Sequence, residues 1–514
     1  MSSHYGIVAI VAVCALTAGV GAFGLRLSRT TSDFYVASRA VSPRLNASAI
    51  GGEYLSAASF LGIAGLIYSR GADMLWFPVG YTVGYLVLLV LIAAPLRRSG
   101  AYTVPDFAEA RLDSPRIRRL CSVLVIGIGW LYLLPQFQGA GLALHVVTGA
   151  PAWVGGLIVA VVVLLSVVAG GMRSITFVQA VQYWLKLTAI CIPAFVLLML
   201  WLRQGQPAPV VLSEPGGGGW ARPLSGFGGQ DHPTYWTYST LLALCLGTMG
   251  LPHVIVRFYT NPDGHAARRT TSWVIGLLAA FYVFTPLYGV WGRVWLPQLP
   301  HGLHPDSVVL LLPSAASPTT LGDVLSALLA GGAFAAFLST ASGLTISVAG
   351  VLDQDLLRPR LHAWTGGDAM SVQGFRVAAV LGILVPYGLS LAGASVALAS
   401  AVGLAFAVAA STFCPLLVLG VWWRRLSTVG AAAGLGIGGT LALLAVSTTV
   451  LFGVPAGWPG ALLSQPAAWT VPITFLVTIV VSLATPDRVP QGTGRMMVLL
   501  HGPEGLVLPA TRGG

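Results

Sequence analysis

The chain has 514 residues, of which 56% are hydrophobic and only 8% are charged. About a quarter of the residues in a soluble domain are usually charged, so this chain has too few charges to cover a water-facing surface. The composition therefore excludes a soluble enzyme, a disordered chain and a secreted disulfide scaffold, and it predicts an all-α polytopic membrane protein. The net charge is +11. In a membrane protein the positions of the arginines indicate how the chain is oriented in the bilayer, and the charge does not indicate a nucleic-acid partner.

Thirteen segments are long and apolar enough to span a bilayer, which takes about 20 mostly apolar residues. The first is interpreted as a retained helix and not as a signal peptide, because residues 1–6 contain no Lys or Arg. The predicted spans are 5–25, 44–69, 73–96, 119–148, 152–171, 176–202, 235–259, 271–297, 319–350, 374–394, 396–423, 428–453 and 467–485.

The basic residues lie mainly on one side of these spans. Loops on that side contain 22 of the 27 Lys and Arg residues, whereas the opposite loops contain Arg70, Arg203, Arg222 and Arg293, and Lys186 lies within a span. One span missed or invented would invert every later loop, so this asymmetry predicts an N-terminus outside and a cytoplasmic C-terminus. We expect a multi-pass protein of the cell (inner or plasma) membrane that contacts the lipid bilayer.

Two spans contain helix-breaking residues near their middle. The second carries Gly51-Gly52 beside Glu53, where we expect a break, and the seventh carries Pro252 at the end of a Gly-rich stretch, 247–253. They are five positions apart in the order of spans, and this odd offset makes them run in opposite directions, as in transporters built from inverted repeats. The predicted organisation is an N-terminal extra helix (1–28), inverted repeat 1 with spans 2–6 (43–203), an external Gly-rich loop (204–234), inverted repeat 2 with spans 7–11 (235–425), two C-terminal helices (426–486) and a cytoplasmic tail (487–514).

The ninth span places three oxygen donors on one helical face, at positions i, i+3 and i+4. They are the carbonyl of Ala336 and the hydroxyls of Ser339 and Thr340. Hard oxygen ligands of this kind suit a small alkali cation. Taken alone, however, Ser and Thr in membrane helices more often bond to their own helix or join neighbouring helices, so both interpretations stay open on these residues.

Several motifs in chain order together resemble the sodium/solute symporter family. They are Asp33–Arg39, Ser56–Gly62, Tyr132–Gln136 with Gly139–Gly141, Gly170–Met172 with Phe177–Gln179, Gly250–His253 with Arg257–Phe258, and Gly403–Ala407 with Trp422–Trp423. The stretches E-Y-L-S-A-A-S-F-L-G and G-L-P-H-V-I-V-R-F-Y are most similar to the acetate/monocarboxylate (cation/acetate symporter) branch. The resemblance implies a LeuT-like fold of inverted five-helix repeats, with one extra helix before them and two after.

The resemblance also implies ligands for Na⁺ and for the solute, and no organic cofactor. Na⁺ would bind to the carbonyls of Gly52, Leu55 and Ala336 and to the hydroxyls of Ser339 and Thr340. The solute would lie beside it, between spans 2, 4, 7 and 11. The candidates for its lining are Tyr54, Ser59, Gln136, Gln138, Met249, Gly250 and Leu251.

Three further ionisable residues have more than one interpretation. Glu53 is the only acid at mid-span, so it could support ion coupling or be paired for structural reasons. Lys186 is the only lysine and could pair with Glu53, attract a carboxylate solute, or snorkel to the interface beside Tyr183 and Trp184. His253 fits a packed histidine better than a proton relay.

The function implied is cation-coupled symport of a small monocarboxylate, such as acetate, propionate or pyruvate, by alternating access. Na⁺ is the expected ion and H⁺ the alternative, and a solute sensor with the same fold is a second possibility. The chain contains no G-x-x-x-x-G-K-[ST] motif for ATP and no H-E-x-x-H or G-x-S-x-G motif. We therefore expect neither ATP drive nor an enzyme, and the sequence leaves the oligomeric state open.

Overall fold

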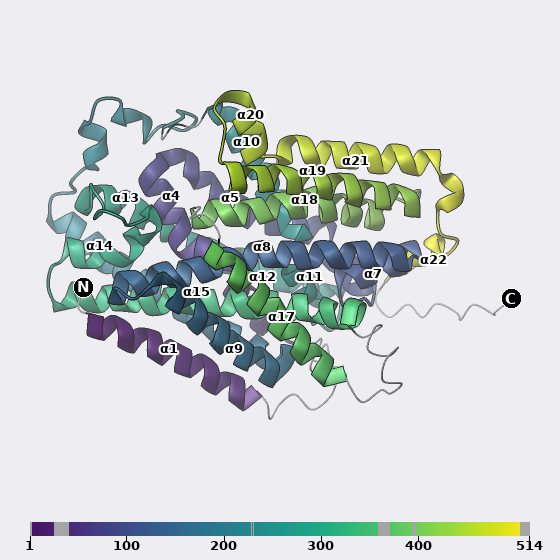
Figure 1. Ribbon diagram of the computed structural model, residues 1–514, viewed down its shortest axis with the longest axis horizontal. Helices are drawn as coiled ribbons and strands as arrows, with labels where there is room; N and C mark the ends of the chain where they lie inside the picture. The colour runs from purple at the N-terminus through teal and green to yellow at the C-terminus, as the bar shows by residue number, and fades with distance from the viewer. Residues whose placement is uncertain are drawn as a thin grey trace.

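The computed structural model of the protein describes residues 3–24, 41–227, 229, 231–357, 371–392 and 397–503. Every regular element in these ranges is a helix, and the long helices lie side by side along the longest axis of the molecule (Figure 1). The predicted all-α class is therefore confirmed. The Asp33–Arg39 motif and the basic residues at 26, 29, 358, 360 and 512 lie outside the described ranges.

The helices fall into two series on either side of the long 204–232 connection. The first series is α1 (Ser3–Gly24), α3 (Pro43–Tyr54), η2 (Ala58–Gly62), α4 (Ile63–Arg70), η3 (Gly71–Leu75), α5 (Trp76–Leu91), α6 (Ala93–Arg98), α7 (Val104–Leu112), α8 (Pro115–Thr148) and α9 (Ala152–Arg203). After η4 (Val210–Ser213) and η5 (Gly217–Gly219), the second is α10 (Pro233–Gly247), η6 (Thr248–Gly250), α11 (Pro252–Phe258), α12 (Gly264–Tyr282), α13 (Thr285–Trp295), η7 (Pro305–Ser307), α14 (Val308–Ala316), α15 (Thr320–Val351), η8 (Leu352–Leu357), α17 (Ser371–Ala392), α18 (Leu398–Trp422), α19 (Thr428–Phe452), α20 (Gly457–Ser464), α21 (Ala467–Ala484), η10 (Pro486–Arg488) and α22 (Thr493–His501).

By length and apolar composition, ten helices of the described chain could cross a membrane, or eleven if one bent pair counts as a single span. This criterion joins Ala58–Leu91, which includes parts of two predicted spans, and it leaves out Ala152–Val168 as too short. A membrane protein with many spans is thus supported, whereas the number thirteen remains a prediction. The short helices α7, α14, α20 and α22 were not predicted, because none is long enough for the 20-residue criterion.

A sharp kink divides α9 into two helices. Gly171 has φ 59° and ψ −168° within the helical run, a combination that only glycine adopts without strain. The kink lies at the end of the predicted fifth span, 152–171. It gives α9 two arms, of which the second, Gly171–Arg203, carries Lys186.

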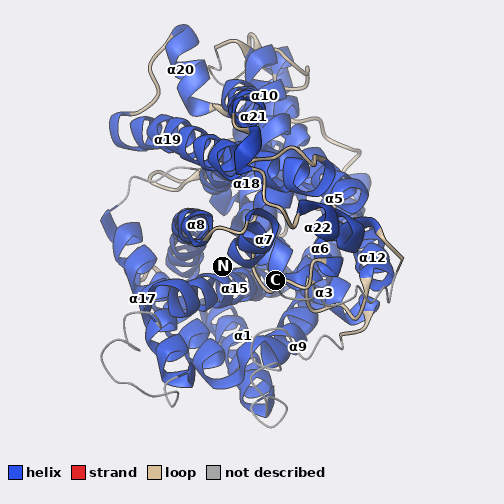
Figure 2. Ribbon diagram, turned by 90° about the vertical axis from the view of Figure 1, so that its right-hand side faces the viewer, coloured by secondary structure: helices blue, strands red, loops and turns tan. Residues whose placement is uncertain are grey.

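The centre of the bundle is formed by α15 and α18. In the most apolar stretch of each of these helices about 89% of the residues are buried, compared with 28% in α1. Figure 2 shows α15 enclosed by its neighbours. The helix α3 packs against α9, α12 and α15, while η6 packs against α18 and α5. Both interrupted spans therefore meet the central helices, and their breaks lie in the interior of the protein.

Candidate functional site

The second span is interrupted, but three residues beyond the predicted position. The helix α3 continues through Gly51 and Gly52 and ends at Tyr54, and Leu55 has φ −73° and ψ 83° before the helix resumes. A Cβ atom at Gly52 would lie 2.1 Å from the carbonyl oxygen of Gln179. The predicted break at Gly51-Gly52 was thus wrong, because these glycines allow α3 to approach α9 closely and do not unwind the helix.

The seventh span is interrupted where the sequence predicts it. The helix α10 passes into the 3-10 turn Thr248–Gly250, Leu251 is extended, and Pro252 begins α11. The axes on the two sides of the break differ by 46°. Pro252 has no amide hydrogen to donate to the preceding turn, so the helix opens there.

Three of the five predicted Na⁺ ligands surround the ammonium group of Lys186, and the other two bond to residues beside it. Lys186 Nζ donates hydrogen bonds to the carbonyls of Gly52 and Leu55 (2.8 Å for Leu55) and to Ser339 Oγ at 2.9 Å. Ser339 Oγ in turn donates to the Ala336 carbonyl at 3.1 Å, and Thr340 Oγ1 donates to the Glu53 carbonyl at 2.6 Å. The unwound second span and α15 are therefore joined through a lysine of the second arm of α9.

The structure contradicts snorkelling of Lys186 and shows no hydrogen bond to Glu53, whereas attraction of a carboxylate solute stays a prediction. Its side chain is 0% exposed, so it does not snorkel, and its ammonium hydrogen bonds go to carbonyl and hydroxyl oxygens. The neighbouring Trp184 is 53% exposed, whereas Tyr183 is buried and donates to the Leu277 carbonyl at 2.9 Å. The arm of α9 thus has an outward face with Trp184 and an inward face with Lys186, and only the packing of the helices distinguishes them.

Glu53 is paired with Arg257 in the interior. Arg257 Nε donates to Glu53 Oε2 at 2.7 Å, and the two side chains are 1% and 3% exposed. The same guanidinium donates to Thr176 Oγ1 at 2.8 Å and to Gln179 Oε1. Arg257 was counted with the loop arginines, which was wrong because α11 carries it into the bundle. The role of Glu53 in ion coupling remains a prediction.

A cluster of aromatic rings lies between the two interrupted spans. The ring of Tyr54 is 4.8 Å from that of Tyr85, 5.8 Å from that of Tyr81 and 6.1 Å from that of Phe406. The Tyr54 hydroxyl lies 3.0 Å from Thr248 Oγ1, which links the two breaks directly. We call this set the aromatic cluster, and its members are Tyr54, Tyr81, Tyr85, Tyr132, His253, Tyr282 and Phe406.

Most of the predicted solute residues adjoin this cluster. Ser59 Oγ lies 2.8 Å from the Tyr282 hydroxyl, and Gln136 Oε1 accepts from the Ala57 amide at 3.0 Å. Met249, Gly250 and Leu251 are buried in the break of the seventh span. Gln138 is the exception, because two residues along α8 from Gln136 it faces another direction, and it lines a cavity of about 650 Å³ with Trp153, His304 and Tyr387.

Several members of the cluster could not be identified from the sequence. Tyr81 and Tyr85 lie in an apolar span without a break, and Phe406 is about 350 residues from Tyr54. The hydroxyls of Tyr81 and Tyr85 and both ring nitrogens of His253 are buried without a hydrogen-bond partner among the described residues. Buried polar groups are usually satisfied, so these atoms make the cluster a candidate place for a polar ligand.

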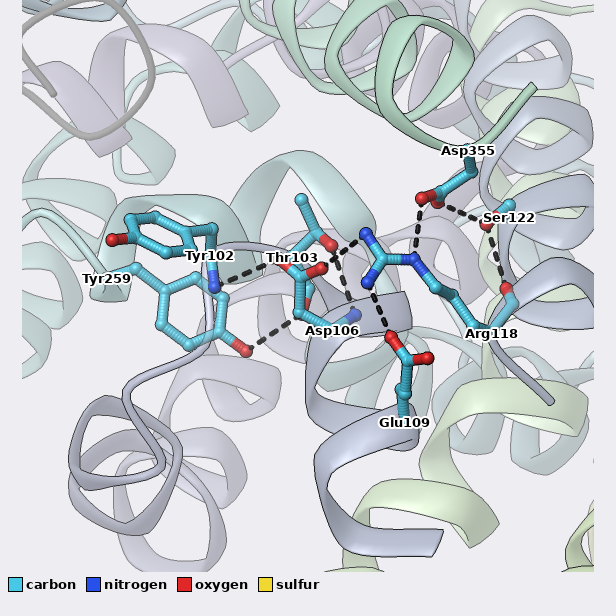
Figure 3. A network of polar contacts seen from close by, with 8 residues as sticks. All are labelled: Tyr102, Thr103, Asp106, Glu109, Arg118, Ser122, Tyr259 and Asp355. Carbon is cyan, nitrogen blue, oxygen red and sulfur yellow. Dashed lines mark hydrogen bonds and ion pairs between the residues drawn. The ribbon is translucent and has the colours of Figure 1, made fainter. Parts of the chain in front are cut away.

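A second polar network lies near α7, toward the end of the bundle that also carries α22 (Figure 1), and Figure 3 shows it from close by. Arg118, at the start of α8, contacts Asp106 (2.8 Å) and Glu109 (2.6 Å) of α7 and Asp355 (2.6 Å) of η8. Burial raises the pKa of the Asp106 carboxyl, an effect that the Arg118 guanidinium opposes. One arginine thereby joins α7, α8 and the end of the central helix α15.

Substitution Arg118→Ala is expected to loosen this end. It leaves the buried Asp355 carboxylate with the Ser122 hydroxyl as its remaining described partner, so the free energy of unfolding should fall by about 1–3 kcal/mol. Thermal unfolding in detergent measures the change. Arg119→Ala, at an exposed neighbouring position, is the control and should unfold as the wild type does. Equal midpoints for the two variants would show that the network adds no stability.

The sequence is similar to those of known symporters and transporters. The model of the family described as "Sodium:solute symporter family" matches residues 34–438 of the chain. An uncharacterized symporter, YwcA, of Bacillus subtilis is 32% identical over 91% of each chain. A monocarboxylic acid transporter of Corynebacterium glutamicum is 31% identical over 92% of this chain and 91% of its own.

Solved structures with the same fold include other transporters. A Na⁺-coupled sialic acid symporter in an outward-open state has a TM-score of 0.70 at 14% identity, covering 94% of this chain and 97% of its own. Mhp1, a nucleobase-cation-symport-1 family transporter, has a TM-score of 0.57 at 15% identity, covering 92% and 99%. These are transporters of the LeuT fold, and at such identity the likeness concerns the fold alone.

Proposed function

Because the chain belongs to the sodium:solute symporter family, we propose that it is a cation-coupled symporter that imports a small monocarboxylate, such as acetate, propionate or pyruvate, by alternating access. The protein is a transporter and not an enzyme. The observation that carries the substrate class is the aromatic cluster, a buried apolar site with unpaired hydrogen-bond donors between two interrupted spans.

The chemistry of the cluster suits a short carboxylic acid. Its rings would surround a methyl or ethyl group, and the hydroxyls of Tyr81 and Tyr85 and a ring nitrogen of His253 are donors that a carboxylate accepts from. The relative named as a monocarboxylic acid transporter supports the same substrate class. Polar donors in an apolar site give strong discrimination, since an analogue without the carboxylate would leave them unpaired.

We propose the same membrane topology that the sequence predicts. Thirteen spans with an external N-terminus and a cytoplasmic C-terminus would place the network of Arg118 at the cytoplasmic end, since its residues belong to the loops on that side. The start of α1 and the helix α22 lie at opposite ends of the bundle (Figure 1), which agrees with an odd number of spans. The two repeats would rock about the aromatic cluster, exposing it to one side and then to the other.

The coupling ion is the open part of the proposal. The fold likeness to a Na⁺-coupled symporter accords with the predicted Na⁺, whereas the position of Lys186 on three of the predicted ligands favours the alternative, H⁺, which needs no metal site. For either cation, the membrane potential contributes about 2.3 kcal/mol per charge per 100 mV.

Uptake of labelled acetate and pyruvate into proteoliposomes tests the function. Wild-type protein should accumulate the acid under at least one imposed driving force (a Na⁺ gradient, a pH gradient or a membrane potential), and ionophores should abolish accumulation. Tyr85→Phe should lower uptake at least tenfold without lowering thermal stability, because it removes a hydroxyl that has no described partner. Tyr238→Phe, at an exposed position of α10, is the matched control.

Two results would contradict the proposal. One is the absence of accumulation under every gradient, which would favour a solute sensor with the same fold. The other is Tyr85→Phe protein that takes up acetate at the rate of the control.

A further inference from the structure

The ammonium group of Lys186 has its full complement of partners. An ammonium has three donors and no acceptor, and the three oxygens around Nζ are the carbonyls of Gly52 and Leu55 and the hydroxyl of Ser339. Two of these are backbone carbonyls at the end of α3, where the helix stops and frees them. In the interior of a membrane protein such carbonyls need a partner from the protein itself, and Lys186 is that partner.

The orientation of the neighbouring hydroxyls fits a donor at this position. Ser339 Oγ accepts from Lys186 and passes its own hydrogen to the Ala336 carbonyl, while Thr340 Oγ1 donates to the Glu53 carbonyl. Lys186 therefore bonds to three of the five predicted Na⁺ ligands directly and reaches Ala336 through Ser339, while Thr340 donates its hydrogen to the neighbouring Glu53 carbonyl. The predicted ligands do not fit a Na⁺ ion while Lys186 is in place. Three of their five oxygens already surround the positive charge of the ammonium group.

The charged groups around Lys186 also disfavour a Na⁺ ion at this site. Glu53 is the acidic side chain next to this set, and it is already paired with Arg257. A second monovalent cation about 4 Å from the ammonium would be strongly repelled, because two like charges at that distance interact strongly where little water screens them. Among the described residues around the site, no further carboxylate offsets this repulsion.

We propose that the Lys186 ammonium is the resident cation of the site that the family resemblance assigns to Na⁺, and that the protein does not bind Na⁺ there. Lys186 is a positioning residue: it joins the second arm of α9 to the unwound second span and to α15, as a bound ion would, but it stays with the protein. The inference concerns the coupling site of the proposed symporter, yet Na⁺ binding can be measured without any transport.

Thermal unfolding of purified protein in detergent provides that measurement. Wild-type protein should unfold at the same temperature in NaCl and in choline chloride of equal ionic strength. Lys186→Ala removes the ammonium and vacates the three oxygens, so its unfolding temperature should be lower in choline chloride and should rise with the logarithm of Na⁺ concentration. Adding Ser339→Ala to that variant should abolish the rise, whereas adding Ser342→Ala should not.

Ser342 is a suitable control because it is buried in the same helix but bonds to the Leu338 carbonyl, away from the site. Lys186→Met, which keeps much of the side-chain volume without the charge, is a second variant should the alanine variant fail to fold. Acetate uptake by wild-type protein should change less than twofold when choline replaces Na⁺ on both sides of the membrane.

The inference is overturned if Na⁺ stabilises the wild-type protein and Ser339→Ala, but not Ser342→Ala, removes that effect. It is also overturned if a folded Lys186 variant responds to Na⁺ no differently from the wild type. Failure of the proposed function would look different: acetate would not accumulate in either salt, while the unfolding temperatures would still report whether Na⁺ binds.

Discussion

Substitution Arg257→Ala should lower the free energy of unfolding by about 3–5 kcal/mol, because it leaves a buried carboxylate without its partner. Arg257 donates to Glu53, Thr176 and Gln179 from three different nitrogens, and Glu53 is 2% exposed. These contacts join α11, α3 and α9 beside the proposed coupling site. The variant should also lose acetate uptake, since the interrupted second span would no longer be held in place.

Equilibrium and thermal unfolding in detergent measure this effect, with three variants for comparison. Arg268→Ala removes an exposed arginine at the start of α12 and should change stability by no more than about 0.5 kcal/mol. Arg257→Lys keeps the charge but not the three-way geometry, so it should be intermediate. The pair Glu53→Gln with Arg257→Met removes both charges and should recover much of the loss. If Arg257→Ala is as stable as Arg268→Ala, the ion pair contributes nothing to the fold.

The sequence predicts the large features well because they depend on local composition. Apolar length gives the spans, and the break in the seventh span appears where Pro252 requires it. The Ser339–Thr340 pair was identified by helical spacing, and the structure brings it to the unwound second span. In each case the physical cause lies within one helix, so a single stretch of sequence contains the information.

The errors concern contacts between distant helices. The Gly51-Gly52 pair suggests flexibility, yet its role is to admit the backbone of α9, about 130 residues away. Arginines of membrane proteins usually lie in loops, so the sequence alone assigns Arg257 to a loop. Its burial is explained only by the approach of α3 and α9. Lys186 could have faced lipid or protein, and nothing in its neighbours Tyr183 and Trp184 distinguishes the two. The aromatic cluster likewise draws on six separate helices, α3, α5, α8, α11, α12 and α18.

Gly52→Ala is expected to be among the most disruptive single substitutions in the chain. The added Cβ would lie 2.1 Å from the Gln179 carbonyl oxygen, whereas ordinary contacts are 3.4 Å or longer, so α3 and α9 would have to separate by more than 1 Å. Overpacking of this kind costs about 1–3 kcal/mol and occasionally more. The shift would also move the Gly52 carbonyl away from Lys186, so both unfolding temperature and acetate uptake should fall.

The nature of the clashing atom makes this prediction specific. At Gly52 the obstacle is backbone, which no side-chain substitution can remove. At Gly80 an added Cβ would meet the side chain of Leu244 at 2.8 Å, so Gly80→Ala should be rescued by Leu244→Ala. Gly276→Ala, in an exposed part of α12 with nothing within 4 Å, should be neutral or slightly stabilising, as alanine favours a helix over glycine by up to about 1 kcal/mol. A Gly52→Ala protein that unfolds and transports like Gly276→Ala would show that α3 and α9 are not in close contact, and with that the geometry of the Lys186 site would be wrong.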